Sequence, residues 1–276
     1  MKGEVKKSTL IFLFIGICCW MSTAIYAQPN TLVMGTIKNK NNLVKTITLQ
    51  INQRYYNNHV DVYTSNVLED GSFAFAVEVK EAQYAMVEYS RNKALIYLEP
   101  NDSLIIDTDA NAFQYALKFS GRSGKNNAFL YQYLKENPQE LDPFKMLQYR
   151  KGSYWYSCAP DMNRLISSTP QRYFKSKMLL RKENALANLD AYVANNPNHL
   201  TPLFKEFLST DILYNWAFHM MTYGHVFKGK HGVTDDFYSF MDEVPLNTTS
   251  IGNYWYREYL LAYICLLYTS PSPRDS

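Results

Sequence analysis

The hydrophobic period of this chain changes once, near Gly121, and that change predicts the fold class. Up to this residue, apolar and polar side chains alternate, as they do in Ile47–Ile51 and Phe73–Val79. A period of two is typical of strands that bury one face. Beyond Gly121, apolar residues recur every three or four positions, as they do in helices. The sequence therefore predicts an α+β protein, in which an N-terminal antiparallel β-sandwich at residues 28–121 precedes an α-helical region at residues 122–264.

Turn signals divide the first region into roughly seven or eight short strands. Asp70-Gly71 lies between two alternating stretches and predicts a hairpin turn. Leu95–Leu98 is a continuous apolar run, which favours a central strand that is buried on both faces. Pro100–Ser103 predicts a turn before the sheet resumes at Leu104–Ile106.

Start and stop signals place the helices of the second region. Thr169-Pro170 and Thr201-Pro202 each combine an N-cap residue with a proline suited to the first helical turn. The apolar stripe from Phe204 to Met220 is wide, so that helix should be largely buried. Helices are expected at Asn126–Glu136, from Thr169-Pro170 to about Asn195, from Thr201-Pro202 to a break within Gly224–Gly232, at Asp235–Asp242 and at Tyr254–Ile264.

Residues 1–27 have the layout of a secretory signal peptide. Basic Lys2, Lys6 and Lys7 precede the apolar run Leu10–Trp20, and small residues follow it up to Ala27. The apolar run is shorter than the roughly 20 residues that a membrane-spanning helix needs. We therefore expect cleavage after Ala27, export of the protein, and a periplasmic or envelope-associated location.

A lipoprotein is an alternative reading of the same segment. Cys18 or Cys19 would then carry the lipid, but neither follows the small residue that usually precedes a lipidated cysteine. An uncleaved anchor is the other alternative. We favour the cleaved signal peptide over both.

Charge and cysteine content exclude several classes of function for the mature part. Between Gln28 and Ile264 there are 24 Lys and Arg residues and 23 Asp and Glu residues. This nearly neutral balance gives no sign of a nucleic-acid surface. Cys158 is the only cysteine in this range. One thiol cannot close an internal disulfide, and no metal-ligand spacing is present.

Several residue groups suggest chemistry, but their patterns favour structural roles. Cys158 has no neighbouring cation that would stabilise a thiolate. His219, His225 and His231 recur every six residues, which does not place them on one face of a helix. Asp107 and Asp109 end a strand, where solvated turn residues are common.

Three further motifs give no specific sign of chemistry either. Gly121–Lys125 lacks the spacing of a phosphate-binding loop. Tyr154–Tyr156 could stack on a sugar, although packing in a core or an interface is the favoured role for such aromatic residues. Asn247–Thr249 is a glycosylation sequon, which matters only in a eukaryotic secretory pathway. The sequence therefore points to no catalytic, cofactor-binding or metal-binding residue.

A family resemblance rests on turn-and-strand motifs at Asp70–Phe75, at Tyr97–Ile106, and at Phe119–Gly124 with Asn126-Asn127. Together they resemble the N-terminal region of TlpA-type, thioredoxin-like thiol-disulfide oxidoreductases of Bacteroidota. Such proteins often have a signal peptide, a β-rich domain of unknown function, a helical segment and then the thioredoxin fold. The family usually has glycine where this chain has Asn101, and asparagine also tolerates the positive φ of such a turn.

The resemblance implies that the catalytic Cys-x-x-Cys motif would lie beyond Ile264. The chain contains no counterpart of it, so no active-site residue is carried over. Residues Cys265–Asp275 (CLLYTSPSPRD) match the translated adapter of transposon-based library preparation over their whole length. We therefore expect residues 265–276 to be foreign to the protein and its own sequence to continue past Ile264.

Two classes of function remain. The first is the accessory N-terminal portion of an envelope thiol-disulfide oxidoreductase whose catalytic domain is missing from this chain. The alternative is a non-catalytic periplasmic binding or interaction module of unknown ligand. Partners would be other envelope proteins or the missing domain.

Export is directly testable. Expression of the chain in a Gram-negative host should give a periplasmic protein whose first residue is Gln28, because the lysines, the apolar run and Ala27 occur in the order that signal peptidase requires. Mass spectrometry of the mature N-terminus measures this. An intact Met1 in the cytoplasmic fraction would contradict the prediction, and a lipid on Cys18 or Cys19 would identify a lipoprotein.

Overall fold

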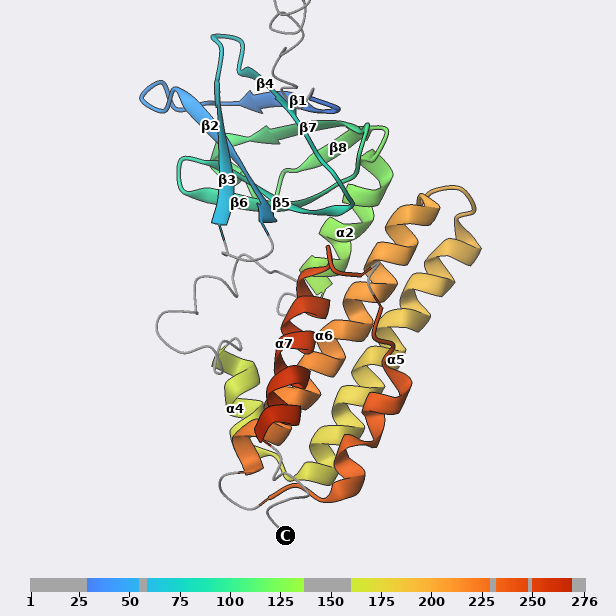
Figure 1. Ribbon diagram of the computed structural model, residues 1–276. Coiled ribbons are helices and arrows are strands. Elements are labelled where there is room, and N and C mark those ends of the chain that lie inside the picture. Colours follow the sequence, from blue (N-terminus) through green and yellow to red (C-terminus); the bar gives the residue numbers. More distant parts are fainter. Residues whose placement is uncertain (1–28, 55–58, 137–159, 229–231, 248–249, 270–276) are drawn as a thin grey trace, which may run out of the picture.

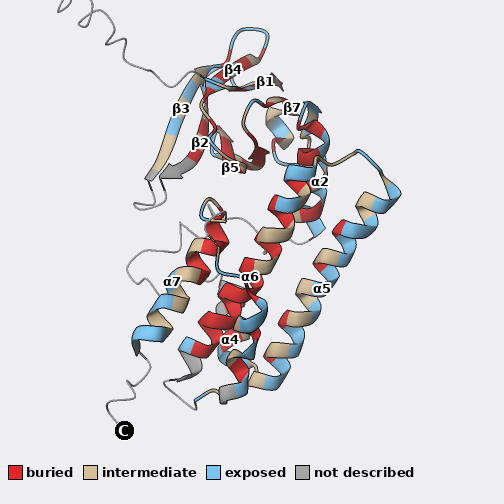
Figure 2. Cartoon of the chain, turned by 45° about the vertical axis from the view of Figure 1, so that its right-hand side comes forward, coloured by how far each residue is buried: buried red, intermediate tan, exposed pale blue. Residues whose placement is uncertain are grey.

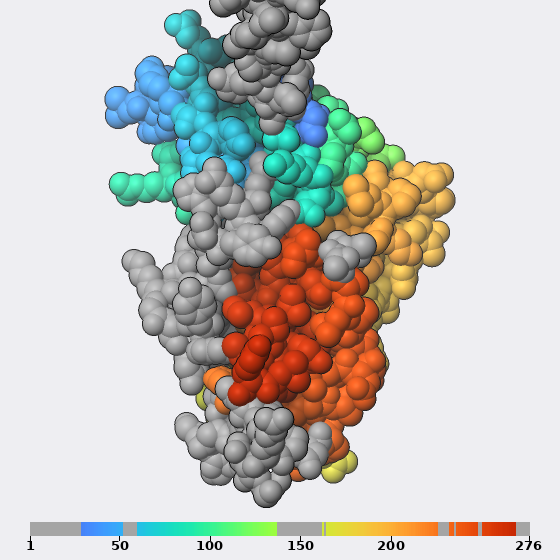
Figure 3. Space-filling model, in the orientation of Figure 1, coloured from blue at the N-terminus to red at the C-terminus, as the bar shows by residue number. Residues whose placement is uncertain are grey.

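The chain folds into two packed β-sheets followed by a group of helices (Figure 1). The computed structural model describes residues 29–54, 59–136, 160–228, 232–247 and 250–269. Within them, the strands all precede Gly121 or end at it, and the long helices all follow it. The predicted α+β class, with an N-terminal β-sandwich and helices after it, is confirmed. The helical region lies against the outer face of one sheet, and Figure 3 shows the two parts in direct contact.

The first sheet has the strand order β4-β1-β7-β8. Its central pair, β1 with β7, is parallel, whereas the neighbouring pairs are antiparallel. This pair departs from the antiparallel pattern expected of the sandwich, because β7 enters the sheet only after the chain has formed all four strands of the other sheet. The strands are β1 (Thr31–Lys38), β4 (Ser72–Val77), β7 (Ser103–Asp109) and β8 (Lys118–Gly121).

The second sheet has the order β3-β2-β5-β6, and its pairs are all antiparallel. Its members are β2 (Thr46–Arg54), β3 (His59–Asn66), β5 (Gln83–Tyr89) and β6 (Asn92–Leu98). Side chains from the facing sides of both sheets form one core, which includes Val33, Leu49, Phe75, Ile96 and Leu104.

Asp70-Gly71 makes a turn but not a hairpin. The turn joins β3 of one sheet to β4 of the other, so the strands on its two sides pair with different partners. Gly71 explains the crossing, because its carbonyl accepts a hydrogen bond from the Ile37 amide at the end of β1. A Cβ atom at Gly71 would lie 2.4 Å from the Ile37 carbonyl oxygen, and its φ of 85° also favours glycine.

The helices bury a second core against the outer face of the β5–β6 side. Tyr84, Met86 and Tyr97 of the sheet belong to it, together with apolar residues of every long helix. Figure 2 shows that α6 is the most buried helix, as its wide apolar stripe predicted. The elements are α2 (Gly124–Glu136), α4 (Pro160–Ser168), α5 (Gln171–Asn195), α6 (Pro202–Lys228), a 3-10 helix at Asp235–Glu243, and α7 (Tyr254–Thr269).

The two Thr-Pro signals lead to different structures. The Thr201 hydroxyl accepts a hydrogen bond from the Phe204 amide and so caps α6, with Pro202 in the first helical position. Thr169 does not cap α5: its amide is bonded to Leu165 at the end of α4, and Pro170 takes the cap position without a side-chain bond. The sequence did not predict the short helix α4. Because the Thr169 amide is bonded to the end of α4, Thr169 does not serve as the N-cap of α5.

Of the two remaining helix ends, one agrees with expectation and one differs. Helix α6 ends at Lys228, within the predicted break at Gly224–Gly232; Gly224 itself lies inside the helix, where its missing side chain leaves room for the Tyr238 ring. Helix α7 continues to Thr269, and Leu266 packs partly against the helical core. The helix expected at Tyr254–Ile264 therefore extends beyond its predicted end, since leucine extends an existing helix at little cost. Residues 270–276 lie outside the described range.

Strand β6 is an edge strand, although its apolar run favoured a central one. Ile96 and Leu98 face the sandwich core and Tyr97 faces the helical core, so both faces are buried. The open edge is covered by Asn127 of α2. Its side-chain oxygen accepts a hydrogen bond from the Tyr97 amide at 2.8 Å, and its nitrogen donates to the Tyr97 carbonyl at 3.0 Å. The amide of Asn127 thus pairs with β6 as the backbone of another strand would.

Among the described residues, none of the helices combines the length and the apolar composition that crossing a membrane requires.

Replacing Asn127 with alanine should lower the free energy of unfolding by about 2–4 kcal/mol, because two buried backbone groups of Tyr97 would lose their partner. Urea denaturation of the purified protein measures this free energy. Gln132→Ala on the exposed side of the same helix is the matched control and should change stability by less than about 0.5 kcal/mol. Equal effects of the two substitutions would contradict the pairing role of Asn127.

Candidate functional site

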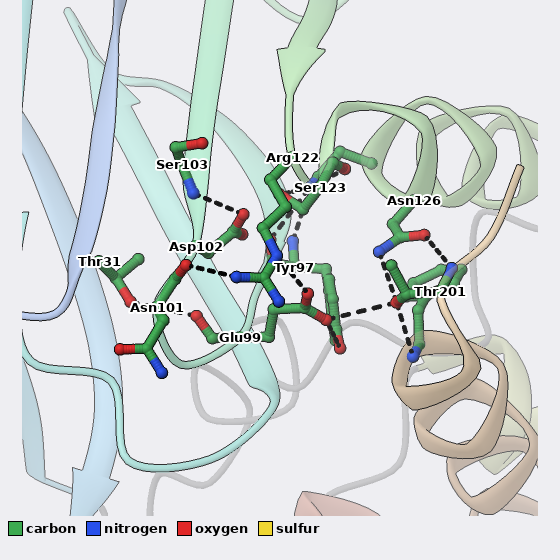
Figure 4. Close-up of polar contacts among 12 residues, drawn as sticks. Thr31, Tyr97, Glu99, Asn101, Asp102, Ser103, Arg122, Ser123, Asn126 and Thr201 are labelled. Atoms are coloured by element: carbon green, nitrogen blue, oxygen red, sulfur yellow. Dashed lines mark hydrogen bonds and ion pairs between the residues drawn. The ribbon is translucent and has the colours of Figure 1, made fainter.

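A cluster of polar side chains lies where the β6–β7 turn meets the N-termini of α2 and α6 (Figure 4). Glu99 is at its centre and is almost fully buried. Its Oε2 atom accepts hydrogen bonds from the Tyr97 hydroxyl at 2.9 Å and the Thr201 hydroxyl at 3.4 Å. The Glu99 carboxylate therefore links the sheet to the cap residue of α6. We call this cluster the joint; it comprises Thr31, Tyr97, Glu99, Asn101, Asp102, Ser103, Arg122, Ser123, Asn126, Asn127 and Thr201.

Arg122 closes the joint from the solvent side. Its Nε atom lies 3.9 Å from Glu99 Oε1, and its guanidinium group donates to the Asn101 carbonyl at 3.0 Å. Asn101 has a φ of 59°, so asparagine does occupy the positive-φ turn position where the resembling family has glycine. The ion pair adds little stability by itself because the Arg122 side chain is more than half exposed.

A second buried carboxyl group, that of Asp102, lies at the start of α2. Its Oδ1 atom accepts a hydrogen bond from the Ser103 amide at 2.7 Å. Burial raises the pKa of Asp102, while Ser123, Ser103 and the positive charge of Arg122 act in the opposite direction. A carboxylate at this place is favourable for α2, since helix N-termini carry a partial positive charge.

Asn126 fixes α2 to α6. Its side chain donates to the Thr201 hydroxyl and accepts from the Thr201 amide, both at 3.0 Å. With Asn127 turned to β6, consecutive asparagines of one helix bind two different elements. The joint is therefore a dense hydrogen-bond network that holds the sheet, α2 and α6 together, in which the Asp102 Oδ2 atom is buried without a hydrogen-bond partner among the described residues.

Away from the joint, Asp211 of α6 is a fully buried carboxyl group. The Tyr84 hydroxyl donates to its Oδ2 atom at 2.8 Å, and Asn253 donates to its Oδ1 atom at 2.9 Å. Burial raises the pKa of Asp211 to about 7, against the opposing effect of these two hydrogen bonds. It thus remains partly protonated near neutral pH.

Of the three histidines singled out in the sequence, His219 and His225 are described, and neither belongs to a group of metal-ligating side chains within the described residues. His219 is buried within α6, where its Nδ1 atom lies 2.7 Å from the Asn215 carbonyl oxygen. Burial lowers the pKa of His219 to about 4, so its ring is neutral. His231 lies outside the described residues, as do Cys158 and Tyr154–Tyr156. The described residues contain no group of three or more His, Cys, Asp or Glu side chains that could hold a metal ion.

Asp107 and Asp109 have specific structural partners. Asp107 accepts a hydrogen bond from the Thr36 hydroxyl at 2.6 Å. Asp109 accepts hydrogen bonds from the Asn39 side chain and from the Asn111 amide. Through the second bond it caps the start of a 3-10 helix. Solvated turn residues were expected at these positions, and Asp109 fits this because it caps a short 3-10 turn through exposed hydrogen bonds. In addition, each carboxylate ties two segments of the chain together.

The outer face of the β4-β1-β7-β8 sheet carries an open groove of about 570 Å³. Its floor is apolar and is formed by Met34, Ala74 and Ile105, which lie side by side in the strand register. Hydroxyl and amide groups and the Asp107 carboxylate line its margin. This volume is in the range of small-molecule sites, although the groove is shallow and polar groups do not converge on one point in it.

The sequence did not reveal the joint as a site. Its members are mostly Asn, Asp, Ser and Thr residues of the kind that turns and helix caps use everywhere, and they were interpreted as such. The one sequence signal was that two of the three family-like stretches, Tyr97–Ile106 and Phe119–Asn127, contain nearly all of its residues. The structure brings these two stretches together.

None of the known protein-family models matches this chain, and comparison with curated proteins gives no significant match.

Proposed function

We propose that this chain is the accessory N-terminal portion of an envelope thiol-disulfide oxidoreductase of the thioredoxin-like class. The observation that supports the proposal is the joint. Two separate stretches that carry the resemblance to TlpA-type proteins meet in it and form one network. If the family shares these stretches because they build the joint, then turn residues rather than reactive residues should carry the resemblance, as they do here.

The chemistry of the joint suits support rather than catalysis. The carboxylates of Glu99 and Asp102 are almost fully buried, and each accepts at least one hydrogen bond from the protein itself. A general acid or base needs reach to a substrate proton. The joint instead holds the sandwich and the helices in one fixed arrangement. A domain whose role is to position another domain needs such rigidity.

Thiol chemistry would need groups outside the described part of the chain. Exchange requires an attacking thiolate and usually a second cysteine that resolves the mixed disulfide. The single described cysteine, Cys265, has a pKa that burial raises, which disfavours the thiolate. The proposed catalytic domain, with its paired cysteines, would follow Ile264 in the native protein, and export would place both in the periplasm.

Insulin reduction tests the proposal. A protein that comprises residues 28–264 alone should show no thiol-disulfide reductase activity, because Cys158 cannot supply both the attacking and the resolving thiol. The protein encoded by the native locus, resequenced with a different library chemistry, should be active. The same protein with both cysteines of its Cys-x-x-Cys motif changed to serine is the control.

Three results would contradict parts of this proposal. Activity in residues 28–264 would show that this part is itself catalytic. A native locus that encodes CLLYTSPSPRDS would remove the argument for a missing domain. A stop codon soon after Ile264, or a following domain without paired cysteines, would favour the second candidate function.

The second candidate is a non-catalytic envelope binding module, and the groove on the outer sheet face favours it. Helices cover the other sheet but not this one within the described residues, so Met34, Ala74 and Ile105 remain partly open. Apolar floors with polar margins are typical of sites for small amphipathic molecules.

Filling the groove tests this candidate. The neutral amphipathic dye N-phenyl-1-naphthylamine should fluoresce more strongly with residues 28–264, and Ala74→Phe should reduce that gain several-fold by occupying the floor. Ala187→Phe, at an exposed position of α5, is the matched control and should leave the signal unchanged. No fluorescence gain with the unmodified protein, or an equal loss in both variants, would contradict binding in the groove.

A further inference from the structure

The Asp211 carboxyl group joins three segments that are far apart in the sequence. It lies on α6, receives a hydrogen bond from Tyr84 of β5 and receives another from Asn253 just before α7. These partners are 127 and 42 residues away along the chain, respectively. Asp211 itself has no exposed surface.

Both partners hold larger units in place. The Asn253 side-chain oxygen accepts a hydrogen bond from the Tyr256 amide at 3.0 Å, so Asn253 is the cap of α7. The Tyr84 ring packs edge-on against Phe207, with ring centroids 4.9 Å apart. Loss of the Asp211 contacts would therefore disturb the start of α7 and the packing between sheet and helix.

The two hydrogen-bond donors of Asp211 are uncharged, and no cation contributes to its pKa. Arg257, the nearest arginine along α7, donates instead to the Ile251 and Gly252 carbonyls. His219 is neutral, because burial lowers its pKa. The other acidic, basic and imidazole side chains described along the neighbouring segments are Glu81 and Glu88 around β5, Lys205, Glu206 and His225 on α6, and Glu258 on α7. Ionisation of Asp211 is therefore uncompensated by positive charge, and a buried unpaired charge is costly.

We infer that Asp211 is a proton-controlled latch: its neutral acid holds β5, α6 and the start of α7 together, and its ionised form loosens them.

The direction of the pH effect follows from linkage. Below about pH 4, Asp211 is protonated in both the closed and the open state, so pH has no effect. Between about pH 4 and pH 7, the solvated open state is ionised while the closed state keeps its proton. The opening constant should then rise by about tenfold per pH unit, and it should level off above pH 7, where both states are ionised.

Amide hydrogen exchange in the α7 segment Tyr254–Tyr259 measures this opening in the full chain. After correction for intrinsic exchange, the opening constant should rise about tenfold per unit from pH 5 to pH 6.5 and flatten by pH 8. Asp211→Asn keeps the shape without the titration and should give a flat profile. Asp190→Asn, at an exposed carboxylate of α5, should keep the wild-type profile.

A second variant guards against misfolding of Asp211→Asn. The Tyr84 hydrogen bond lowers the pKa of Asp211, so Tyr84→Phe should move the point of flattening to higher pH. A flat profile in the wild-type protein would overturn the latch. So would an unchanged slope in Asp211→Asn, or an unmoved flattening point in Tyr84→Phe.

Discussion

The pairing of one asparagine side chain with a strand edge sets how this protein is assembled. Asn127 satisfies both backbone groups of Tyr97 at the open edge of β6, and these groups are buried. Unpaired, they would cost about 1–3 kcal/mol each. Because Asn127 is on α2, its bonds to the sheet edge also fix the position of α2. The hydrogen bonds between Asn126 of α2 and Thr201 then fix the start of α6 against α2.

This arrangement explains an ambiguity in the sequence. A strand that is apolar on both faces is normally central to a sheet. Strand β6 has that composition for another reason: Ile96 faces the sandwich core, Tyr97 faces the helical core, and a helix replaces the missing neighbour. Composition reports how many faces of a strand are buried, and it does not distinguish a covering strand from a covering helix.

Local signals predicted the elements well, and nonlocal pairings were the limit. Alternation in Phe73–Val79 and the cap at Thr201 are set by neighbours in the chain, so the sequence shows them. The crossing at Gly71 and the parallel pairing of β1 with β7 depend on distant backbone. The joint was missed for the same reason, since Asn126 and Asn127 resemble ordinary helix-start residues until their partners 75 and 30 positions away are known.

Helix α6 is attached to the sheet side at two points of different character. Thr201, at its cap, is held by uncharged Asn126 and by Glu99, whose carboxylate has Arg122 nearby. Asp211 lies ten residues further on, about 15 Å along the axis, and has no such charge partner. These two attachments flank the aromatic packing of Phe204 and Phe207 on Tyr84 and Tyr97, and together they hold α6 on the sheet. Release of Asp211 alone would leave the Thr201 contacts in place, so the protonation state of one buried carboxyl group would act on the start of α7 while the cap of α6 stays fixed to the joint.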